Sequence, residues 1–184
     1  QIFIEEGDDY YTATTYNNLA TLYNAQKNSK LSISYAEKGL ELAAQVGADY
    51  DYALLESNLA QSYHDLKDYT QSREYYLRAL SHFKAQNAED DIATMYLLMS
   101  PVYAALGMPD SSAYYTESYS ELNKKLTEQE IQQLTSDLEA RYQSEQKDAA
   151  ISQQQLELRN KNIQLYGSLL LALVLGVVGY LLYS

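Results

Sequence analysis

The sequence contains no cysteine and is poor in positive charge. Without cysteine, the chain cannot hold a disulfide framework, a cysteine nucleophile or a thiolate metal site. Asp and Glu number 25 against 13 Lys and Arg, which gives a formal net charge of −12. Binding to nucleic-acid phosphates requires clustered Lys and Arg, and the sequence shows no basic stripe. We therefore expect no nucleic-acid partner for these residues.

The patterns of known catalytic and metal sites are also missing. His64 and His82 are the two histidines of the chain, and no Asp or Glu at ligand spacing accompanies them. The sequence has no glycine-rich phosphate loop, no Gly-x-Ser-x-Gly and no His-Glu-x-x-His. We expect no catalytic residue, no metal and no cofactor in these residues. A kinase domain that follows Ser184 is a further possibility.

Three segments in the first part of the chain resemble one another at a spacing of 40 residues. They are NNLATLY at 17–23, SNLAQSY at 57–63 and, in degraded form, LLMSPVY at 97–103. A fixed period of 20 to 50 residues is typical of a solenoid, in which a repeated unit cannot bury its apolar face alone.

Apolar residues within one unit fall at helical spacing on two successive segments. In the second copy the first segment carries Leu55, Leu59, Tyr63 and Leu66, and the second carries Tyr76, Ala79, Leu80 and Phe83. Small residues at Ala60, Ser72 and Ala79 allow two backbones to approach closely. Each unit is therefore predicted to be a hairpin of two antiparallel helices.

This pattern resembles the tetratricopeptide repeat over about residues 1–122, as the end of one repeat and three full ones. The second copy carries the likeness best, through Leu59, Ala60, Tyr63, Leu66, Asp68, Tyr69, Tyr76, Ala79 and Leu80. The long period and the opening NNLA are similar to the repeats of kinesin light chains and of bacterial peptide-sensing regulators. The resemblance implies an all-α solenoid whose first helices line a concave groove for a protein or peptide.

The candidate groove residues are polar and uncharged apart from one histidine: Asn17, Asn18, Thr21, Ser57, Asn58, Gln61 and His64. An asparagine amide donates and accepts, so Asn18 and Asn58 are candidates for bracketing a peptide backbone. In the similar peptide-binding repeats, an asparagine before the Leu-Ala pair has this role. The alternative is that these side chains are solvated or bonded to a neighbouring segment. A groove that clamps a C-terminal carboxylate would need inward Lys and Arg, which are absent.

Residues 123–164 are predicted to form a long polar helix, because the sequence has no Gly or Pro between Asp110 and Tyr166. Ile131, Leu134 and Leu138 keep coiled-coil spacing. Such a helix is either an exposed linker or weakly paired with a partner. A homodimer through this helix and the span that follows is one expected arrangement.

Residues 165–183 carry no charge and would reach ~28 Å as a helix, close to the hydrocarbon core of a bilayer. We predict a single transmembrane helix here, with a buried core helix as the alternative. Ser168, Ala172 and Gly176 are four residues apart, so they are candidates for packing two such helices together.

The order of these parts resembles the membrane-anchored tetratricopeptide signal transducers of Bacteroidetes, in which a helix similar to LTSDLEARYQSEQKDAAISQQQLELRNKNIQLYG leads into the membrane. This resemblance implies periplasmic repeats, one pass through a bacterial inner membrane, and a following histidine kinase or helix-turn-helix domain. We therefore expect the sequence, which begins at Gln1, to be part of a longer protein.

The positive-inside rule favours the opposite orientation, because Arg159 and Lys161 directly precede the predicted span. Two alternatives to a periplasmic sensor and anchor therefore stay open. One is a tail-anchored cytoplasmic scaffold, and the other is a structural subunit of an envelope complex.

Overall fold

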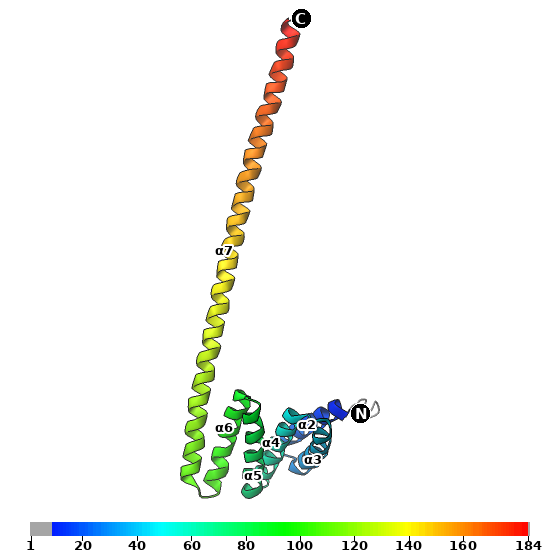
Figure 1. The fold of residues 1–184 in the computed structure, drawn as a ribbon, viewed down its shortest axis with the longest axis vertical. Coiled ribbons are helices and arrows are strands. Elements are labelled where there is room, and N and C mark those ends of the chain that lie inside the picture. The colour runs from blue at the N-terminus through cyan, green and yellow to red at the C-terminus, as the bar shows by residue number, and fades with distance from the viewer. Residues whose placement is uncertain (1–8, 184) are drawn as a thin grey trace. The chain divides into compact units, whose positions relative to one another are not determined.

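The computed structural model describes residues 9–183, and this range contains helices and short turns but no strand. The helices are α2 (Asp9–Ala25), α3 (Ser29–Val46), α4 (Asp49–Asp65), α5 (Tyr69–Ala85), α6 (Glu89–Ala105) and α7 (Pro109–Tyr183) (Figure 1). The all-α prediction is confirmed. Residues 1–8, which the expected first domain includes, lie outside the described range.

The 40-residue period of the sequence reappears in the helix boundaries. The first helices of the three hairpins begin at Asp9, Asp49 and Glu89, and the second helices begin at Ser29, Tyr69 and Pro109. The turns inside the hairpins repeat as well, with φ angles of 57° at Lys27, 65° at Lys67 and 72° at Gly107. The chain therefore builds the same hairpin three times.

Pairs of tyrosines repeat with the same period and join the two helices of each hairpin. Tyr23 and Tyr35 stack at 5.4 Å between ring centroids with an interplanar angle of 4°, and Tyr63 and Tyr75 stack at 5.5 Å and 4°. In the third hairpin Tyr103 and Tyr115 lie 5.0 Å apart and are tilted by 31°. Aromatic packing thus holds α7 against α6 as it holds the earlier pairs.

Small side chains allow the helices of the first two hairpins to approach closely. The first core cluster consists of Ala13, Ala20, Ala36, Ala43, Ala48, Leu55 and Leu59. Gly39 of α3 lies deepest in this contact, since a Cβ there would stand 2.6 Å from Leu55 Cδ2 and 3.2 Å from the Cβ of Tyr16. A methyl group at this position would therefore require the Leu55 side chain to move.

We expect Gly39→Ala to lower the free energy of unfolding by up to about 2 kcal/mol. Overpacking a core costs about 1–3 kcal/mol, and the better helix propensity of alanine returns about 1 kcal/mol. Urea unfolding of the detergent-solubilised chain, followed by circular dichroism, measures the change. Leu55→Ala should make the same substitution less harmful, because it opens the space that the new methyl needs. Equal costs in both backgrounds would contradict this packing.

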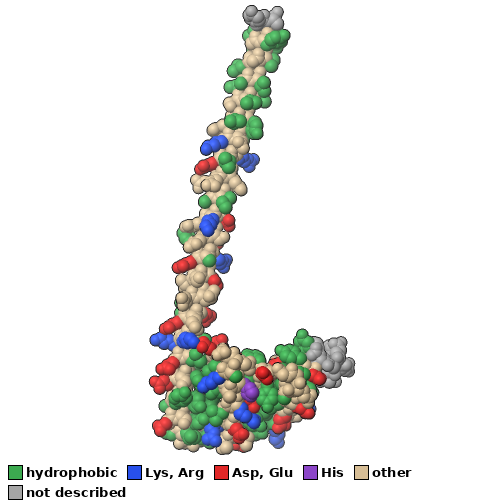
Figure 2. Space-filling model, in the orientation of Figure 1, with side chains coloured by type: hydrophobic (Ala, Val, Ile, Leu, Met, Phe, Trp, Pro, Cys, Tyr) green, Lys and Arg blue, Asp and Glu red, His purple; other side chains and the backbone are tan. Residues whose placement is uncertain are grey.

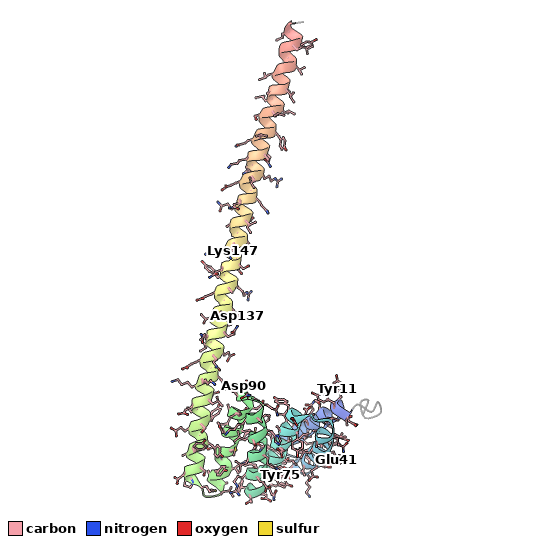
Figure 3. The ribbon with its side chains drawn as sticks, in the orientation of Figure 1. Tyr11, Glu41, Tyr75, Asp90, Asp137 and Lys147 are labelled. Carbon is pink, nitrogen blue, oxygen red and sulfur yellow. The ribbon has the colours of Figure 1, made fainter. Side chains whose placement is uncertain are left out.

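Helix α7 contributes to two compact units, one that ends at Gln129 and one that begins at Glu130. Residues up to Gln129 belong to the unit that holds the hairpins. In the second unit every described side chain from Glu130 to Leu182 is exposed, including Asp137 and Lys147 (Figure 3). Charged residues are interspersed along the polar part of this helix, and its last part is apolar (Figure 2). This last part is long and apolar enough to cross a membrane.

Candidate protein-binding surface

The first helices α2 and α4 lie side by side and are joined by side-chain amides. Asn58 Nδ2 donates to Asn17 Oδ1 at 2.9 Å and to Thr21 Oγ1 at 3.0 Å. In return, Asn24 Nδ2 donates to the backbone oxygen of Asn58 at 2.9 Å and to its Oδ1 at 3.1 Å. Asn58 is therefore the centre of a hydrogen-bond network between two repeats.

Further contacts extend this network along both helices. Ser62 Oγ donates to Asn24 Oδ1 at 2.7 Å, Thr14 Oγ1 donates to Asp51 Oδ2 at 3.0 Å, and Lys27 Nζ lies 3.1 Å from Asp65 Oδ2. We call these contacts the polar seam: Thr14, Asn17, Thr21, Asn24 and Lys27 on one side, and Asp51, Asn58, Ser62 and Asp65 on the other.

The polar seam places the two asparagines singled out from the sequence in different surroundings. Asn58 uses both its amide nitrogen and its amide oxygen inside the seam, so a peptide reaches this amide only by displacing those bonds. Asn18 is exposed, while its neighbour Asn17 is 7% exposed and accepts from Asn58. The contribution of Ser62 and Asp51 was missed, although their separations of 38 and 37 residues from Asn24 and Thr14 follow the repeat.

The other candidate residues lie on α4 and are half-buried. Gln61 Nε2 donates to Asp65 Oδ1 at 3.1 Å, and Gln61 Oε1 accepts from the Tyr76 hydroxyl at 3.1 Å. His64 packs edge-on against Tyr69 at 5.6 Å, and Ser57 is partly accessible beside them. Gln61 thus has hydrogen-bond partners within the protein, whereas His64 Nδ1 is buried without one. The structure brings Asn17, Thr21 and Asn58 together but not all seven residues.

The contact between α4 and α6 is mostly apolar, in contrast to the polar seam. Met95, Met99 and Val102 of α6 share a core cluster with Ala53 and Ala60 of α4. One polar bond crosses at the start of the helices, where the Tyr50 hydroxyl donates to Asp91 Oδ2 at 2.9 Å. The surface formed by the first helices therefore changes from amide-rich to apolar along the solenoid.

The first helices carry acidic residues and no Lys or Arg. Helix α2 has one acidic residue, α4 has four and α6 has three, including Asp90 at its start (Figure 3). The Lys and Arg residues of the hairpins lie in the turns and on the second helices. A partner that contacts all three first helices meets only neutral and negative side chains.

We expect Asn58→Ala to lower the free energy of unfolding by about 1–3 kcal/mol, because it leaves the buried Asn17 amide oxygen without its donor and removes one of the two acceptors of Asn24 Nδ2. Urea unfolding of the detergent-solubilised chain tests this. Asn18→Ala is the matched control, since its exposed side chain should change stability by no more than about 0.5 kcal/mol. Similar small effects for both variants would show that the seam does not stabilise the repeats.

A buried carboxyl group distinguishes the middle hairpin. The Glu56 side chain is 1% exposed, with Arg78 Nε 3.0 Å from its Oε1 and His82 Nε2 3.7 Å from its Oε2. The Arg78 guanidinium lies 4.4 Å from the centre of the Tyr75 ring, and His82 packs against Tyr52. Burial raises the pKa of the Glu56 carboxyl to about 7, against the opposing effect of Arg78.

This raised pKa makes the stability of the repeats depend on pH. A carboxyl whose pKa is higher in the folded than in the unfolded state favours folding below pH 4.5, and this contribution is lost as the pH rises through about 7. The difference in unfolding free energy between the wild type and Glu56→Gln should therefore fall by up to about 3 kcal/mol between pH 4.5 and 8. Urea unfolding at several pH values measures it. The exposed Glu74→Gln is the control, and a pH-independent difference for Glu56→Gln would contradict the assignment.

The predicted helix-packing residues lie on the apolar part of α7. Ser168, Ala172 and Gly176 are exposed, and Ala172 and Gly176 border a shallow groove with Leu169, Leu173, Val177 and Tyr180. Within residues 9–183, no three His, Asp or Glu side chains gather as metal ligands would.

Comparison with known proteins identifies the repeated hairpins. Sequence profiles of the tetratricopeptide repeat match residues 12–46 and 51–125, together more than half of the chain. The chain is a tetratricopeptide-repeat protein. Such repeats bind protein partners, so the hairpins form a protein-interaction module. No curated protein matches the sequence.

Solved structures show the same fold at low sequence identity. The tetratricopeptide-repeat domain of Arabidopsis FLU is 14% identical with a TM-score of 0.60, over 64% of this chain and 98% of that domain. BtubC from P. vanneervenii is 19% identical with a TM-score of 0.57, over 62% of this chain and 48% of the other. The apo form of RapI is 19% identical with a TM-score of 0.59, over 65% of this chain and 34% of the other. This chain thus matches about half of BtubC and a third of RapI, and these likenesses concern the fold alone.

Proposed function

We propose that this chain is the receptor and anchor part of a bacterial membrane-bound signalling protein. Its repeats bind a protein or peptide, and α7 carries the effect of binding through the bilayer. The observation that carries this proposal is that α7 (Pro109–Tyr183) is one uninterrupted helix, which begins as the second helix of the third repeat and ends in the apolar stretch. A helix without Gly or Pro between 110 and 166 lacks the residues that most often break or kink a helix, which suits it to transmit a shift.

The apolar end of α7 supports membrane insertion. All described side chains of residues 165–182 are exposed, and none carries a charge. An exposed apolar surface of this length is unfavourable in water and matches the thickness of a bilayer core. Tyr166 and Tyr180 lie near the ends of the stretch, where aromatic residues favour the interface. Ser168, Ala172 and Gly176 allow two such helices to pack closely, which supports a dimer.

The surface of the first helices supports a neutral or basic ligand. It carries no Lys or Arg, so it disfavours an acidic partner or a free carboxylate. Asn18 and Thr21 are exposed on α2, and Leu97 is 48% exposed on α6. These residues offer both polar and apolar contacts beside the polar seam, where an extended or helical segment of a partner would lie.

A second candidate function is a cytoplasmic scaffold anchored by α7. The specific observation in its favour is the pair Arg159 and Lys161, because positive charge next to a span favours the cytoplasmic side. Repeats and anchor serve either function, and the two differ in the side of the membrane on which the repeats lie.

Cysteine labelling in intact cells distinguishes the two functions, and the absence of native cysteines makes the background clean. One variant carries Ser81→Cys, an exposed position on α5, and the other carries a cysteine appended after Ser184. We expect a thiol reagent that does not cross the inner membrane to label Ser81→Cys and to leave the appended cysteine unlabelled.

The reverse labelling pattern would exclude the periplasmic receptor and support the scaffold. Labelling of both positions would show that α7 does not span the membrane. Permeabilised cells are the control, in which both cysteines should react.

A further inference from the structure

Each hairpin before the last forms a slot that the next first helix fills. Helix α4 packs on α2 and α3, and α6 packs on α5. The floor of the second slot consists of Tyr76, Leu80 and Phe83, which are 1%, 5% and 0% exposed and share a core cluster with Met95 and Met99 of α6. These contacts define the interface that repeats along the solenoid.

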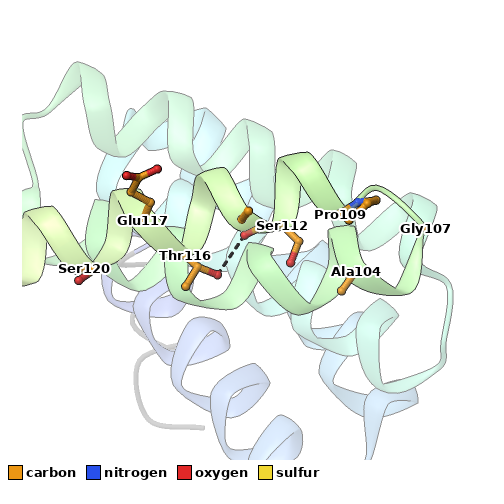
Figure 4. A pocket seen from close by; sticks show the side chains of 8 residues that line it. Ala104, Gly107, Pro109, Ser112, Thr116, Glu117 and Ser120 are labelled. Atoms are coloured by element: carbon orange, nitrogen blue, oxygen red, sulfur yellow. Dashed lines mark hydrogen bonds between the residues drawn. The ribbon is translucent and has the colours of Figure 1, made fainter.

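The third hairpin has the corresponding slot, and no helix of the described residues fills it. The residues 40 positions after Tyr76, Leu80 and Phe83 are Thr116, Ser120 and Asn123, and all three are exposed. A groove of about 950 Å³ lies here, between the end of α6 and the start of α7 (Figure 4). It is lined by Ala104, Gly107, Pro109, Ser112, Ala113, Thr116, Glu117 and Ser120. We call it the terminal slot.

Thr116 on the floor of the terminal slot and the neighbouring Ser100 already have hydrogen-bond partners. Thr116 Oγ1 donates to the Ser112 backbone oxygen at 3.0 Å, and the Ser100 and Thr116 hydroxyl oxygens are 2.7 Å apart. A ligand that covers the floor therefore does not have to supply hydrogen bonds to these hydroxyl groups. Most of the remaining lining is apolar, and Ala104, Pro109 and Ala113 contribute to it.

The charges around the terminal slot are negative. Glu117 lines it, Asp110 is exposed at the start of α7, and no Lys or Arg is among the lining residues. A second copy of this chain would bring its own net charge of −12 to the slot, which disfavours a second copy as the occupant of this slot. A basic partner is favoured for the same reason.

We propose that the terminal slot binds an amphipathic α-helix of a partner protein, with large apolar side chains on one face and Lys or Arg at its edges. Continuity with the two filled slots sets the shape of the occupant, because α4 and α6 show that a helix fits this interface. The small floor residues set its size, because Thr116 and Ser120 leave the volume that Tyr76 and Leu80 fill in the second hairpin. This surface is separate from the groove of the first helices and goes beyond the proposed function.

Fluorescence anisotropy with model peptides tests the proposal on the full chain in phosphatidylcholine nanodiscs. The probe is a labelled amphipathic helix of Leu and Lys, with Leu at i, i+3, i+4 and i+7. The same helix with Glu in place of Lys is the comparison, and binding to empty nanodiscs is subtracted. We expect the Leu-Lys helix to bind and the Leu-Glu helix not to bind.

Two slot variants and two matched controls locate the binding. We expect Ala104→Trp, which fills the slot, and Glu117→Lys, which reverses its charge, each to weaken binding at least about tenfold. The controls are Ala44→Trp, at an exposed position of α3, and Glu37→Lys, at the position of the first hairpin that corresponds to Glu117. They should change binding less than about twofold.

Equal binding of the two helices, no binding of either, or equal effects of slot and control variants would overturn the proposal. So would a chain that is dimeric in the nanodisc and becomes monomeric on Ala104→Trp, because its own second copy would then fill the slot. Circular dichroism of each variant checks that the hairpins remain folded.

Discussion

A hairpin of two amphipathic helices leaves apolar surface uncovered, and this constraint underlies the whole described solenoid. Each hairpin gains a core only when the next first helix packs on it, as α4 does on the first hairpin and α6 on the second. The packing requires small residues where backbones approach, which is why Gly39 lies against Leu55 and why alanines dominate the first core. In the third hairpin no further first helix of the described residues covers the second helix. The exposed residues there, Thr116, Ser120 and Asn123, are small or polar, and the second helix continues to Tyr183.

The two interfaces between first helices meet the constraint with different chemistry. Between α2 and α4 a chain of amides, hydroxyls and one ion pair closes the contact, and Asn58 is its centre. At the contact between α4 and α6, the methionine and valine side chains of α6 form an apolar cluster with alanines of α4. A polar interface specifies its register more strictly, because a shifted amide is left without a partner. The apolar interface tolerates small shifts and lies next to the hairpin from which α7 continues.

Most of the fold was predictable from the sequence, because the signals for it are local. Helical spacing of Leu55, Leu59 and Tyr63, and the recurrence of such groups after 40 residues, predicted three helix hairpins, and the helix boundaries follow that period. The groove residues were predicted less well. The sequence pattern treats Asn18 and Asn58 as equivalent, yet Asn58 is bonded within the seam and Asn18 is exposed, since α4 has α2 beside it. Glu56 gave no local signal, because its partners lie on the following helix.

Local sequence patterns are sufficient to predict the helices, their period, the acidic character of the first helices and the charge-free end of α7, since each depends on residues close together in the chain. The packing of the helices, in contrast, sets which amides are buried, which carboxyl is held with an elevated pKa and which hairpin keeps an open slot. These features depend on contacts between helices, and in the polar seam the partners are 34 to 41 residues apart. Whether a side chain meets a partner or solvent at that distance is settled by packing, which the spacing of residues along one helix does not encode.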